Sequence, residues 1–183
     1  AELNNVPIMM DESINFIMKY IKDNNIKNIL EIGTAIGYSA IMVSSVDSDI
    51  FITTIERDEK RYLEALKNIK KLKLEDRIQL IYHDALDVKL EDTYDLILID
   101  AAKAQNQKFF QKFEKNLAPR GTIITDNMQF HGLVEQENEN IKSRNLRQLV
   151  RKVKDYKAFL EKNIRYETKL YNIGDGLAIS RKL

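Results

Sequence analysis

Five short and almost uninterrupted apolar runs are the feature of this sequence that most constrains its fold. They cover residues 28–33, 50–56, 78–83, 94–100 and 121–126. Apolar runs of this length are typical of strands that are buried on both faces of a parallel sheet. Between them, apolar residues recur at helical spacing, as at Ile14, Ile17 and Ile21. The alternation predicts an α/β fold with helices on both faces of the sheet.

Polar and turn-forming residues mark where the helices should begin and end. Asp11 and Asp58 each precede a helical pattern, and we expect both to act as N-caps, because aspartate accepts hydrogen bonds from the free amides of a first turn. A third pattern, over residues 109–117, runs into Pro119 and Gly121, which predict the end of that helix.

The C-terminal part of the chain has a different pattern. A long helical pattern covers residues 142–163, and strand-like runs follow at 166–171 and 177–181. The Gly-Asp-Gly sequence at 174–176 predicts a turn between them and hence an antiparallel hairpin. Five parallel strands followed by a hairpin form the mostly parallel seven-stranded sheet of class I methyltransferases, which is Rossmann-like. We interpret residues 1–183 as a single domain of this type.

Composition limits the chemistry that the domain can perform. The chain has no cysteine and two histidines, which excludes a cysteine nucleophile, a disulfide scaffold and a His-rich metal site. Any metal must therefore be held mainly by oxygen ligands. The formal net charge of +1 argues against a strongly basic nucleic-acid-binding protein. No long apolar run or signal peptide is visible, so we expect a cytoplasmic protein with no membrane partner.

The segment 31–37 lies where the first predicted strand turns into a helix. Gly33 permits a tight turn, and the small residues around it leave room for a ligand against the backbone. Thr34 and Ser39 add hydroxyl groups near the helix N-terminus, where free amides can bind a carboxylate. The segment has fewer glycines than a dinucleotide-binding loop, which favours the amino-acid end of S-adenosylmethionine over a pyrophosphate. A plain strand-to-helix turn is the alternative.

Two further strand ends fit an adenosine-type cofactor. Glu56 ends the second run, where a carboxylate can accept both hydroxyls of a ribose. Asp84 follows the third run and could hold the adenine amino group, while Ala85 leaves room for the ring. Taken singly, Glu56 could be a surface carboxylate and Asp84 a helix cap. Because parallel strands end at one edge, the three features together predict the binding of an adenosine-type cofactor.

The fourth and fifth runs end in potential metal ligands. Asp100 closes one run, and Asp126 and Asn127 close the other. Two carboxylates and an amide oxygen suit a hard cation such as Mg²⁺, whereas capping of strands or helices is the alternative. Lys103 follows Asp100, and beside a metal its ammonium group would release a proton more readily. It could then deprotonate or orient a substrate hydroxyl, and a solvated surface lysine is the alternative.

The sequence from Val6 to Ser180 resembles the cation-dependent O-methyltransferases, which include the catechol and caffeoyl-CoA enzymes. The motifs that carry the resemblance are EIGTAIGYS, TTIERD, DAL, LILIDAAKA, IITDN and GDGLAIS. The resemblance implies that Lys103 is the catalytic lysine. It implies that Asp100, Asp126 and Asn127 bind the metal. Asp100 is also a catalytic residue in this sense, because it is a ligand of the metal. The cofactor contacts that it implies are Met9, Gly33, Ser39, Glu56, Asp84, Ala85 and Asp100.

Within this family, the chain is most similar to the bacterial members that methylate 5-hydroxyuridine at the tRNA wobble position. The resemblance implies the tRNA anticodon region as partner, 5-methoxyuridine as product and a homodimer as assembly. 5-Hydroxyuridine, like catechol, presents two neighbouring oxygens that Mg²⁺ could chelate. A small-molecule acceptor of the catechol type is the alternative, and a non-catalytic RNA- or cofactor-binding module is a third reading. The family's N-terminal helical segment is expected to be missing before Val6.

The near-neutral net charge hides one basic segment. Residues 142–169 hold ten Lys and Arg residues against three Asp and Glu residues. The basic side chains fall on a different side of the predicted helix from the apolar ones and could follow a phosphate backbone, whereas a solvated helix face is the alternative. Arg144 and Arg147 are the best candidates for substrate contact, because they follow the loop after the metal motif. His131 in that loop is expected to face the substrate or to be structural, and His83 to pack at a strand end.

Overall fold

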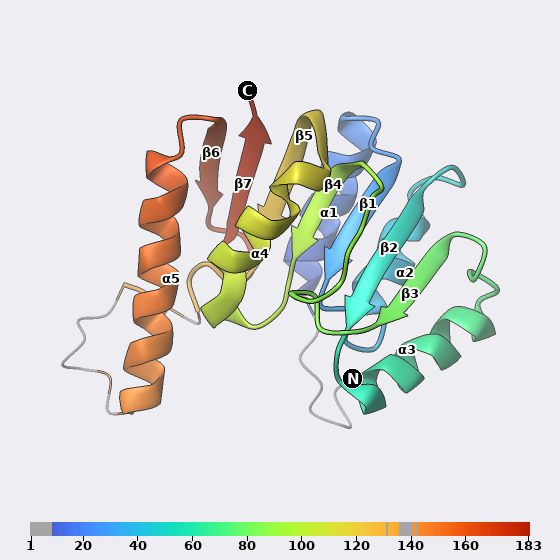
Figure 1. Cartoon of the computed structure of the whole chain (residues 1–183), viewed down its shortest axis with the longest axis horizontal. Coiled ribbons are helices and arrows are strands. Elements are labelled where there is room, and N and C mark those ends of the chain that lie inside the picture. The colour runs from blue at the N-terminus through green and yellow to red at the C-terminus, as the bar shows by residue number, and fades with distance from the viewer. Residues whose placement is uncertain (1–8, 131, 136–140, 142) are drawn as a thin grey trace.

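The computed structural model describes residues 9–130, 132–135, 141 and 143–183, and its centre is one seven-stranded sheet (Figure 1). The strand order is β3-β2-β1-β4-β5-β7-β6. The first five strands of this order are parallel, and β7 runs antiparallel to both of its neighbours. The strands are β1 (Asn28–Ile32), β2 (Phe51–Glu56), β3 (Ile78–Tyr82), β4 (Tyr94–Ile99), β5 (Leu117–Thr125), β6 (Tyr166–Tyr171) and β7 (Leu177–Lys182).

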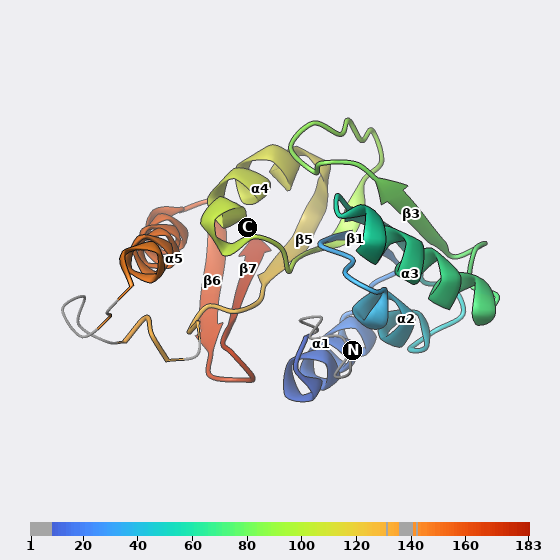
Figure 2. The ribbon, with the colours of Figure 1, turned by 90° about the horizontal axis from the view of Figure 1, so that it is seen from below.

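Helices cover both faces of the sheet, as Figure 2 shows in the view from below. One face carries α1 (Asp11–Asp23), α2 (Tyr38–Ser44) and α3 (Glu59–Lys71). The other carries α4 (Asn106–Phe113) and α5 (Arg144–Lys162). Two short 3₁₀ turns, η2 (Lys103–Gln105) and η3 (Glu114–Asn116), flank α4. This arrangement confirms the predicted α/β fold with a C-terminal antiparallel hairpin.

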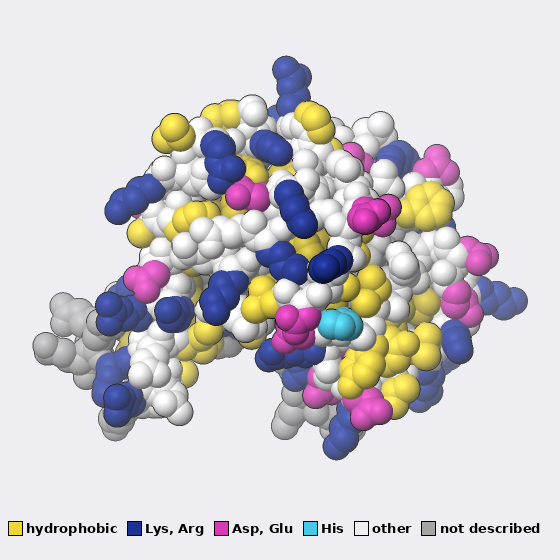
Figure 3. All heavy atoms as spheres, viewed as in Figure 1, with side chains coloured by type: hydrophobic (Ala, Val, Ile, Leu, Met, Phe, Trp, Pro, Cys, Tyr) yellow, Lys and Arg dark blue, Asp and Glu magenta, His cyan; other side chains and the backbone are white. Residues whose placement is uncertain are grey.

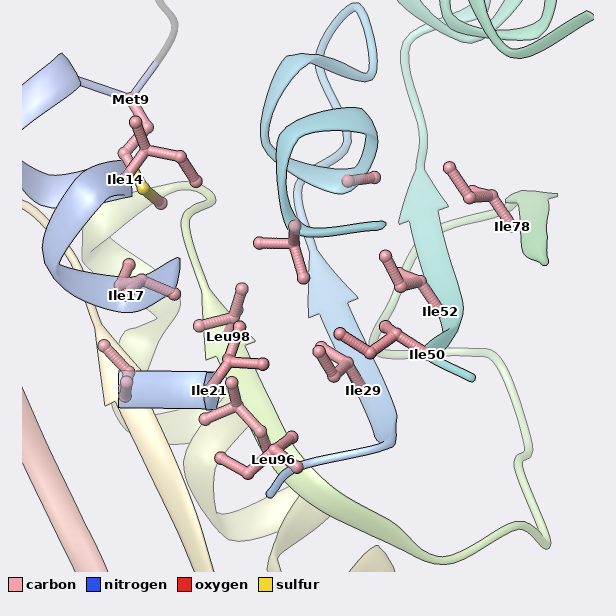
Figure 4. Close-up of a cluster of buried hydrophobic side chains, with 14 of the residues drawn as sticks. Met9, Ile14, Ile17, Ile21, Ile29, Ile50, Ile52, Ile78, Leu96 and Leu98 are labelled. Atoms are coloured by element: carbon pink, nitrogen blue, oxygen red, sulfur yellow. The ribbon is translucent and has the colours of Figure 1, made fainter. Parts of the chain in front are cut away.

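The core on the α1 side shows why the sequence forms these layers. Ile14, Ile17 and Ile21 recur at helical spacing in α1 and point toward Leu96 and Leu98 of β4 (Figure 4). All five side chains are at most 2% exposed. Burial of each contributes about 1.5–3 kcal/mol relative to an exposed position. The apolar side chains that recur at helical spacing in α1 and those on one face of β4 therefore pack in one layer.

The structure confirms one of the two predicted N-caps and contradicts the other. Asp58 caps α3 as predicted, accepting a hydrogen bond from the Arg61 amide at 3.0 Å. Asp11 does not cap α1: the N-cap is Met10, and the Asp11 carboxylate accepts a hydrogen bond from the Tyr38 hydroxyl at 2.8 Å. Asp11 therefore hydrogen-bonds to Tyr38 of α2 instead of capping its own helix as the local sequence pattern had predicted.

The third helix is also shorter than its apolar pattern suggested. α4 ends at Phe113, and Leu117 begins β5, where it pairs with Tyr94. Pro119 lies in β5 where the pairing with β4 is irregular, so the missing amide costs no ladder hydrogen bond. Burial of Leu117 in the sheet outweighs its helical spacing to Phe113.

Two further expectations need correction. The run 78–83 was expected to be buried on both faces, but β3 is an edge strand in which Gln79 and Tyr82 are exposed. The helix expected at 142–163 begins at Arg144 and ends at Lys162, and Lys142 lies outside the described residues. Leu146 belongs to the apolar side of the predicted helix by its spacing, but it is 38% exposed.

The parallel strands bring their carboxyl ends to one edge, at the bottom of the sheet in Figure 1. Ile32 at the end of β1 pairs with Ile55 of β2 and Ile99 of β4, and Ile99 pairs with Thr125 of β5. The loops that follow these strands are therefore neighbours, although they are far apart in the sequence. None of the described helices is long and apolar enough to cross a membrane.

Candidate active site

A cleft of about 270 Å³ opens at the carboxyl edge of the sheet. It contains seven of the residues proposed from the sequence, which come from the last residue of β2 and from the segments after β1, β3, β4 and β5. These seven are Gly33, Glu56, Asp84, Ala85, Asp100, Lys103 and Asn127. The topology therefore brings together residues that the sequence places up to a hundred positions apart.

The loop after β1 is pressed against the neighbouring strands. The amides of Gly33 and Thr34 donate to the carbonyl oxygen of Ile55, at 3.0 and 3.3 Å. Gly33 has a φ of +100°, and a Cβ atom there would lie 2.0 Å from the carbonyl oxygen of Asp100. Only glycine fits this position, because both the backbone conformation and the space exclude a side chain.

A buried carboxylate lies beneath this loop. Glu31 is 1% exposed and accepts hydrogen bonds from the hydroxyls of Ser39 and Thr54. The Thr34 hydroxyl in turn hydrogen-bonds that of Thr54 at 2.6 Å. Burial raises the pKa of Glu31 to about 7, against the lowering effect of the two hydroxyls. Thr34 and Ser39 thus use their hydroxyls in a network below the cleft, and their contact with a cofactor stays a prediction.

The Glu56 carboxylate fixes the shape of the same loop. One oxygen accepts a hydrogen bond from the Ala35 amide at 2.8 Å, and the other accepts from the amides of Arg57 and Asp58, also at 2.8 Å. Ala35 is held with a φ of +48°. Glu56 lines the cleft, so a carboxylate oxygen of restricted orientation is presented to a ligand there.

The far end of the cleft is formed by the loop after β3. The Asp84 carboxylate accepts from the Leu86 amide at 2.9 Å and from the Arg57 guanidinium at 3.2 Å, and these hydrogen bonds lower its pKa. Ala85 is 7% exposed and leaves the cleft floor free of bulk. His83 was expected to pack at the strand end, but it is exposed and lines the cleft. Figure 3 shows a histidine, in cyan, on this face beside charged side chains.

Two carboxylates and an amide follow β4 and β5. The Asp100 amide donates to the Ile32 carbonyl at 3.0 Å, and the Asp126 amide donates to that of Ile99 at 3.1 Å. Both residues therefore continue the strand ladder and lie next to one another at the edge. Asn127 lines the cleft with a φ of +64°, which asparagine tolerates better than most residues.

The two carboxylates have shifted pKa values. Burial, followed by repulsion from Asp126 and Glu31, raises the pKa of Asp100 to about 7. Burial also raises the pKa of Asp126 to about 6, with Asp175 adding repulsion and Lys103 opposing the shift. Within the described part of the chain neither carboxylate forms a salt bridge. Two neighbouring acidic groups with no salt-bridge partner among the described residues fit a divalent cation.

The ligand set is small. The described residues contain no cluster of three or more His, Cys, Asp and Glu side chains placed to hold a metal. A cation at Asp100 and Asp126 would therefore depend on the Asn127 amide oxygen and on water or substrate for its other ligands. Asp126 is 4% exposed and does not itself line the cleft.

The loop after β5 is attached to the turn of the β6–β7 hairpin. The Met128 amide donates to the Gly176 carbonyl at 2.9 Å, and the Gln129 amide donates to the Asp175 carbonyl at 2.8 Å. A Cβ atom at Gly176 would lie 2.7 Å from the Gln129 side chain. The Gly-Asp-Gly turn thus supports the proposed metal ligands, in addition to closing the hairpin.

Lys103 begins η2 and lines the cleft, and its catalytic role stays a prediction. The other proposed residues lie elsewhere. Met9 is 4% exposed and packs in the apolar core with α1, outside the cleft lining. Arg144 is exposed at the start of α5, and the Arg147 guanidinium donates to the Ile141 carbonyl at 2.5 Å. His131, Lys142 and residues 6–8 lie outside the described residues.

Sequence reasoning missed several residues of this region. Arg57, Arg61 and Phe109 line the cleft, and Glu31 supports its loop. Glu31 could have been recognised from the sequence, because it is a charged residue inside the apolar run 28–33. The other three lie on α3, the loop before it and α4, where nothing in the local pattern distinguishes them from surface or core residues.

A sequence model of the O-methyltransferase family matches residues 1–183. The chain belongs to the O-methyltransferase family. The match agrees with the geometry just described, because the cleft lies at the strand ends where an open α/β sheet binds its ligands. The family and the fold confirm the predicted S-adenosylmethionine-dependent O-methyltransferase of the class I type.

Curated relatives of this O-methyltransferase include plant enzymes. It is 32% identical over 191 residues to tapetum-specific methyltransferase 1 of Arabidopsis thaliana. It is 27% identical over 191 residues to caffeoyl-CoA O-methyltransferase of Populus kitakamiensis. Each alignment covers 100% of this chain and 81% of the relative.

Solved structures are also similar to this O-methyltransferase. One, described as a candidate caffeoyl-CoA O-methyltransferase of Staphylococcus aureus, is 45% identical with a TM-score of 0.95, covering 100% of this chain and 88% of the other. The Podospora anserina methyltransferase PaMTH1, solved with S-adenosylhomocysteine, is 25% identical with a TM-score of 0.84, covering 93% and 78%. The predicted metal, acceptor and homodimer stay predictions.

Proposed function

We propose that the protein transfers the methyl group of S-adenosylmethionine to one of two neighbouring oxygens on a planar acceptor held by a divalent cation. The observation that carries this proposal is the pair of neighbouring carboxylates, half-buried Asp100 and buried Asp126, without a salt bridge in the described part of the chain. With Asn127 they form an all-oxygen donor set that suits Mg²⁺. When bound, the cation would hold the two acceptor oxygens and lower the pKa of the hydroxyl.

The cofactor would lie along the cleft from β1 to β3. The backbone at Gly33 allows close approach, and the Glu56 carboxylate would accept the ribose hydroxyls. Asp84 would accept the adenine amino group above Ala85. The bound S-adenosylhomocysteine in PaMTH1 supports this use of the cleft.

Lys103 would act on the acceptor hydroxyl. Its side chain lines the cleft after β4, whereas Asp84 follows β3, and β2 and β1 lie between these two strands in the sheet. From there it would orient the hydroxyl or take its proton as the oxygen attacks the methyl group. Most of the rate enhancement would come from alignment of the two reactants and from control of the charge between them.

A small molecule of the catechol type is the acceptor that the relatives favour. The Populus relative is a caffeoyl-CoA O-methyltransferase, and the Staphylococcus structure carries the same description as a candidate. A caffeoyl group carries two neighbouring hydroxyls on a planar ring. The proposed donor set accepts such a pair directly.

A second acceptor, 5-hydroxyuridine at the tRNA wobble position, is favoured by one observation. Exposed basic residues, including Arg144, Arg151 and Lys152, lie on α5. α5 contacts η2, which begins with Lys103. Lys and Arg side chains gather over this helix on the left of Figure 3. A nucleic acid whose phosphate backbone lies along α5 would therefore pass close to η2 and could place a base in the cleft beside Lys103.

Methyl transfer from labelled S-adenosylmethionine tests the proposal. Caffeic acid, caffeoyl-CoA and tRNA that carries 5-hydroxyuridine are each incubated with the protein and Mg²⁺, and the products are identified by mass spectrometry. We expect methylation that is abolished by chelation and lowered at least about a hundredfold by Asp126→Asn. Asp23→Asn, which changes an exposed acid paired with Lys19 at the end of α1, is the control and should keep full activity. Full activity of Asp126→Asn, or after chelation, would exclude the metal-dependent reaction.

A further inference from the structure

Lys103 is held over the ring of an aromatic residue from another loop. Its ammonium nitrogen lies 5.3 Å from the ring centroid of Phe130. An ammonium group at this distance over a ring face is attracted by the negative charge of the π system. Phe130 is only 9% exposed, so water screens the contact little. The ring therefore restricts a side chain that is otherwise long and flexible.

The ring is itself held by a separate apolar cluster. Phe130 packs with Val134 and Ile141 of the following loop and with Val150 and Val153 of α5. Both valines of α5 are fully buried. The ring position is therefore set by the helix, independently of the side chains that line the cleft.

The backbone at Phe130 is held in an unfavourable conformation. Its φ is +48°, in the left-handed region that phenylalanine rarely adopts. The chain on both sides is fixed, because the Gln129 amide donates to the Asp175 carbonyl at 2.8 Å and the Leu133 amide donates to that of Phe130 at 3.0 Å. Conformations of this kind persist where surrounding contacts impose them, and they cluster at functional sites.

The Phe130 ring is an uncharged partner for the Lys103 ammonium group, which lies beside the proposed metal site. Lys103 is near enough to Asp100 and Asp126 to lower the pKa of both. Those carboxylates are the proposed ligands of a divalent cation, so they would no longer attract the ammonium group once the cation is bound. The attraction of the ring does not depend on the cation.

We propose that Phe130 is a positioning residue, which holds the Lys103 ammonium group over the cleft so that it faces the acceptor hydroxyl. This proposal rests on the proposed function. The residue touches neither cofactor nor acceptor in this role and acts through Lys103. It links the proposed catalytic lysine to α5 through Val150 and Val153.

Three variants separate the electrostatic role of the ring from its packing. Phe130→Leu keeps an apolar side chain and the same backbone strain but removes the π system. Phe130→Tyr keeps a ring face. Leu160→Ala removes a buried side chain of α5 from a different apolar cluster, to which Phe130 does not belong. All three are compared with the wild type for kcat, for acceptor KM and for the Kd of S-adenosylhomocysteine by calorimetry.

We expect Phe130→Leu to lower kcat by about tenfold with little change in the Kd of S-adenosylhomocysteine. Phe130→Tyr should retain kcat within about twofold, and Leu160→Ala should do the same. Equal kcat for Phe130→Leu and the wild type would overturn the proposal. So would an equal loss in Phe130→Leu and either of the other two variants, because packing would then explain it.

A spectroscopic measurement tests the contact without any acceptor or metal. The methylene protons next to the Lys103 nitrogen should show an upfield ring-current shift in NMR spectra, assigned by the loss of their signal in Lys103→Met. The shift should vanish in Phe130→Leu and persist in Phe130→Tyr. Its absence from the wild type would exclude the contact. An inactive wild type with the shift present would instead count against the proposed function.

Discussion

A side chain at position 33 would place its first carbon atom 2.0 Å from the carbonyl oxygen of Asp100. The loop that is proposed to bind the cofactor and the strand end that supplies a proposed metal ligand are thus in backbone contact. Neither can move without the other. The two halves of the candidate site, one for the methyl donor and one for the cation, share this contact.

Gly33→Ala should disrupt both halves. The new methyl group forces the two backbones apart, so we expect a loss of about 2–4 kcal/mol in unfolding free energy and at least about tenfold weaker binding of S-adenosylhomocysteine. Denaturant unfolding and calorimetry measure the two effects. Gly132→Ala is the matched control, because Gly132 also has a positive φ, +75°, but no atom within 4 Å of a new Cβ. Equal effects of the two substitutions would show that backbone strain alone matters at Gly33.

Glu31→Gln should change how stability depends on pH. The pKa of Glu31 is about 7 in the folded chain and has an ordinary value of 4.5. Between these values the folded chain keeps a proton that the unfolded chain has lost, so this group lowers stability as pH rises, by up to about 1.4 kcal/mol per pH unit. Removal of the group should flatten that fall and raise stability at pH 8 by roughly 1–3 kcal/mol.

Urea unfolding between pH 5 and 8 measures this difference. Glu64→Gln, at a surface position of α3 beside Lys67, serves as the control and should follow the wild-type profile. Parallel profiles for Glu31→Gln and the wild type would mean that the buried carboxylate does not hold its proton above pH 4.5.

Binding of Mg²⁺ should weaken as the pH falls. The pKa values of Asp100 and Asp126 are raised to about 7 and 6, and a cation binds only the ionised carboxylates. Affinity should therefore be greatest above pH 7 and fall by up to about tenfold per pH unit for each proton displaced. Calorimetry in buffers of different ionisation enthalpy measures both the affinity and the protons released. Constant affinity from pH 8 to pH 5.5 would contradict a site made of these two groups.

Charge reversal on α5 separates the two acceptor classes. Arg144→Glu with Arg151→Glu should weaken tRNA binding by at least about tenfold, while methylation of a catechol-type acceptor stays unchanged. Both side chains are exposed, whereas Arg147 is left intact because its guanidinium supports the Ile141 carbonyl. Lys70→Glu with Lys71→Glu on α3 is the charge-matched control. Unchanged tRNA affinity at low salt would leave the small-molecule acceptor as the supported one.

Much of the fold could be predicted because its signals are local. Strand runs at 28–33 and 94–100 are continuous, since neighbours bury both faces of β1 and β4, and Gly174 and Gly176 mark the hairpin turn. Once the strand ends are predicted, the positions of Asp100, Glu56 and Asp84 at the carboxyl edge of the sheet follow directly. Asp11 and Leu117 were misassigned because their partners, Tyr38 and Tyr94, come from elsewhere in the chain.

The candidate site was predicted to the extent that it follows from strand ends. The role of Glu31 depends on Ser39 and Thr54, which only the packed fold brings to it. The contact of Lys103 with Phe130 joins two loops, and the entry of Arg57 and His83 into the cleft depends on how α3 and β3 pack. Such contacts between separate elements carry no local sequence pattern.

The attachment of residues 128 and 129 to the hairpin turn has a consequence for the order of assembly. The carbonyl groups that hold this loop belong to Asp175 and Gly176, and the turn also reaches α1, where the Gly174 amide donates to Glu12 at 3.4 Å. During synthesis the first helix, the proposed metal ligands and this turn emerge in that order. The loop that carries the proposed metal ligands therefore reaches its final form only when β7 has joined the sheet, so the segment that completes the candidate site is synthesised after all the residues proposed to act in it.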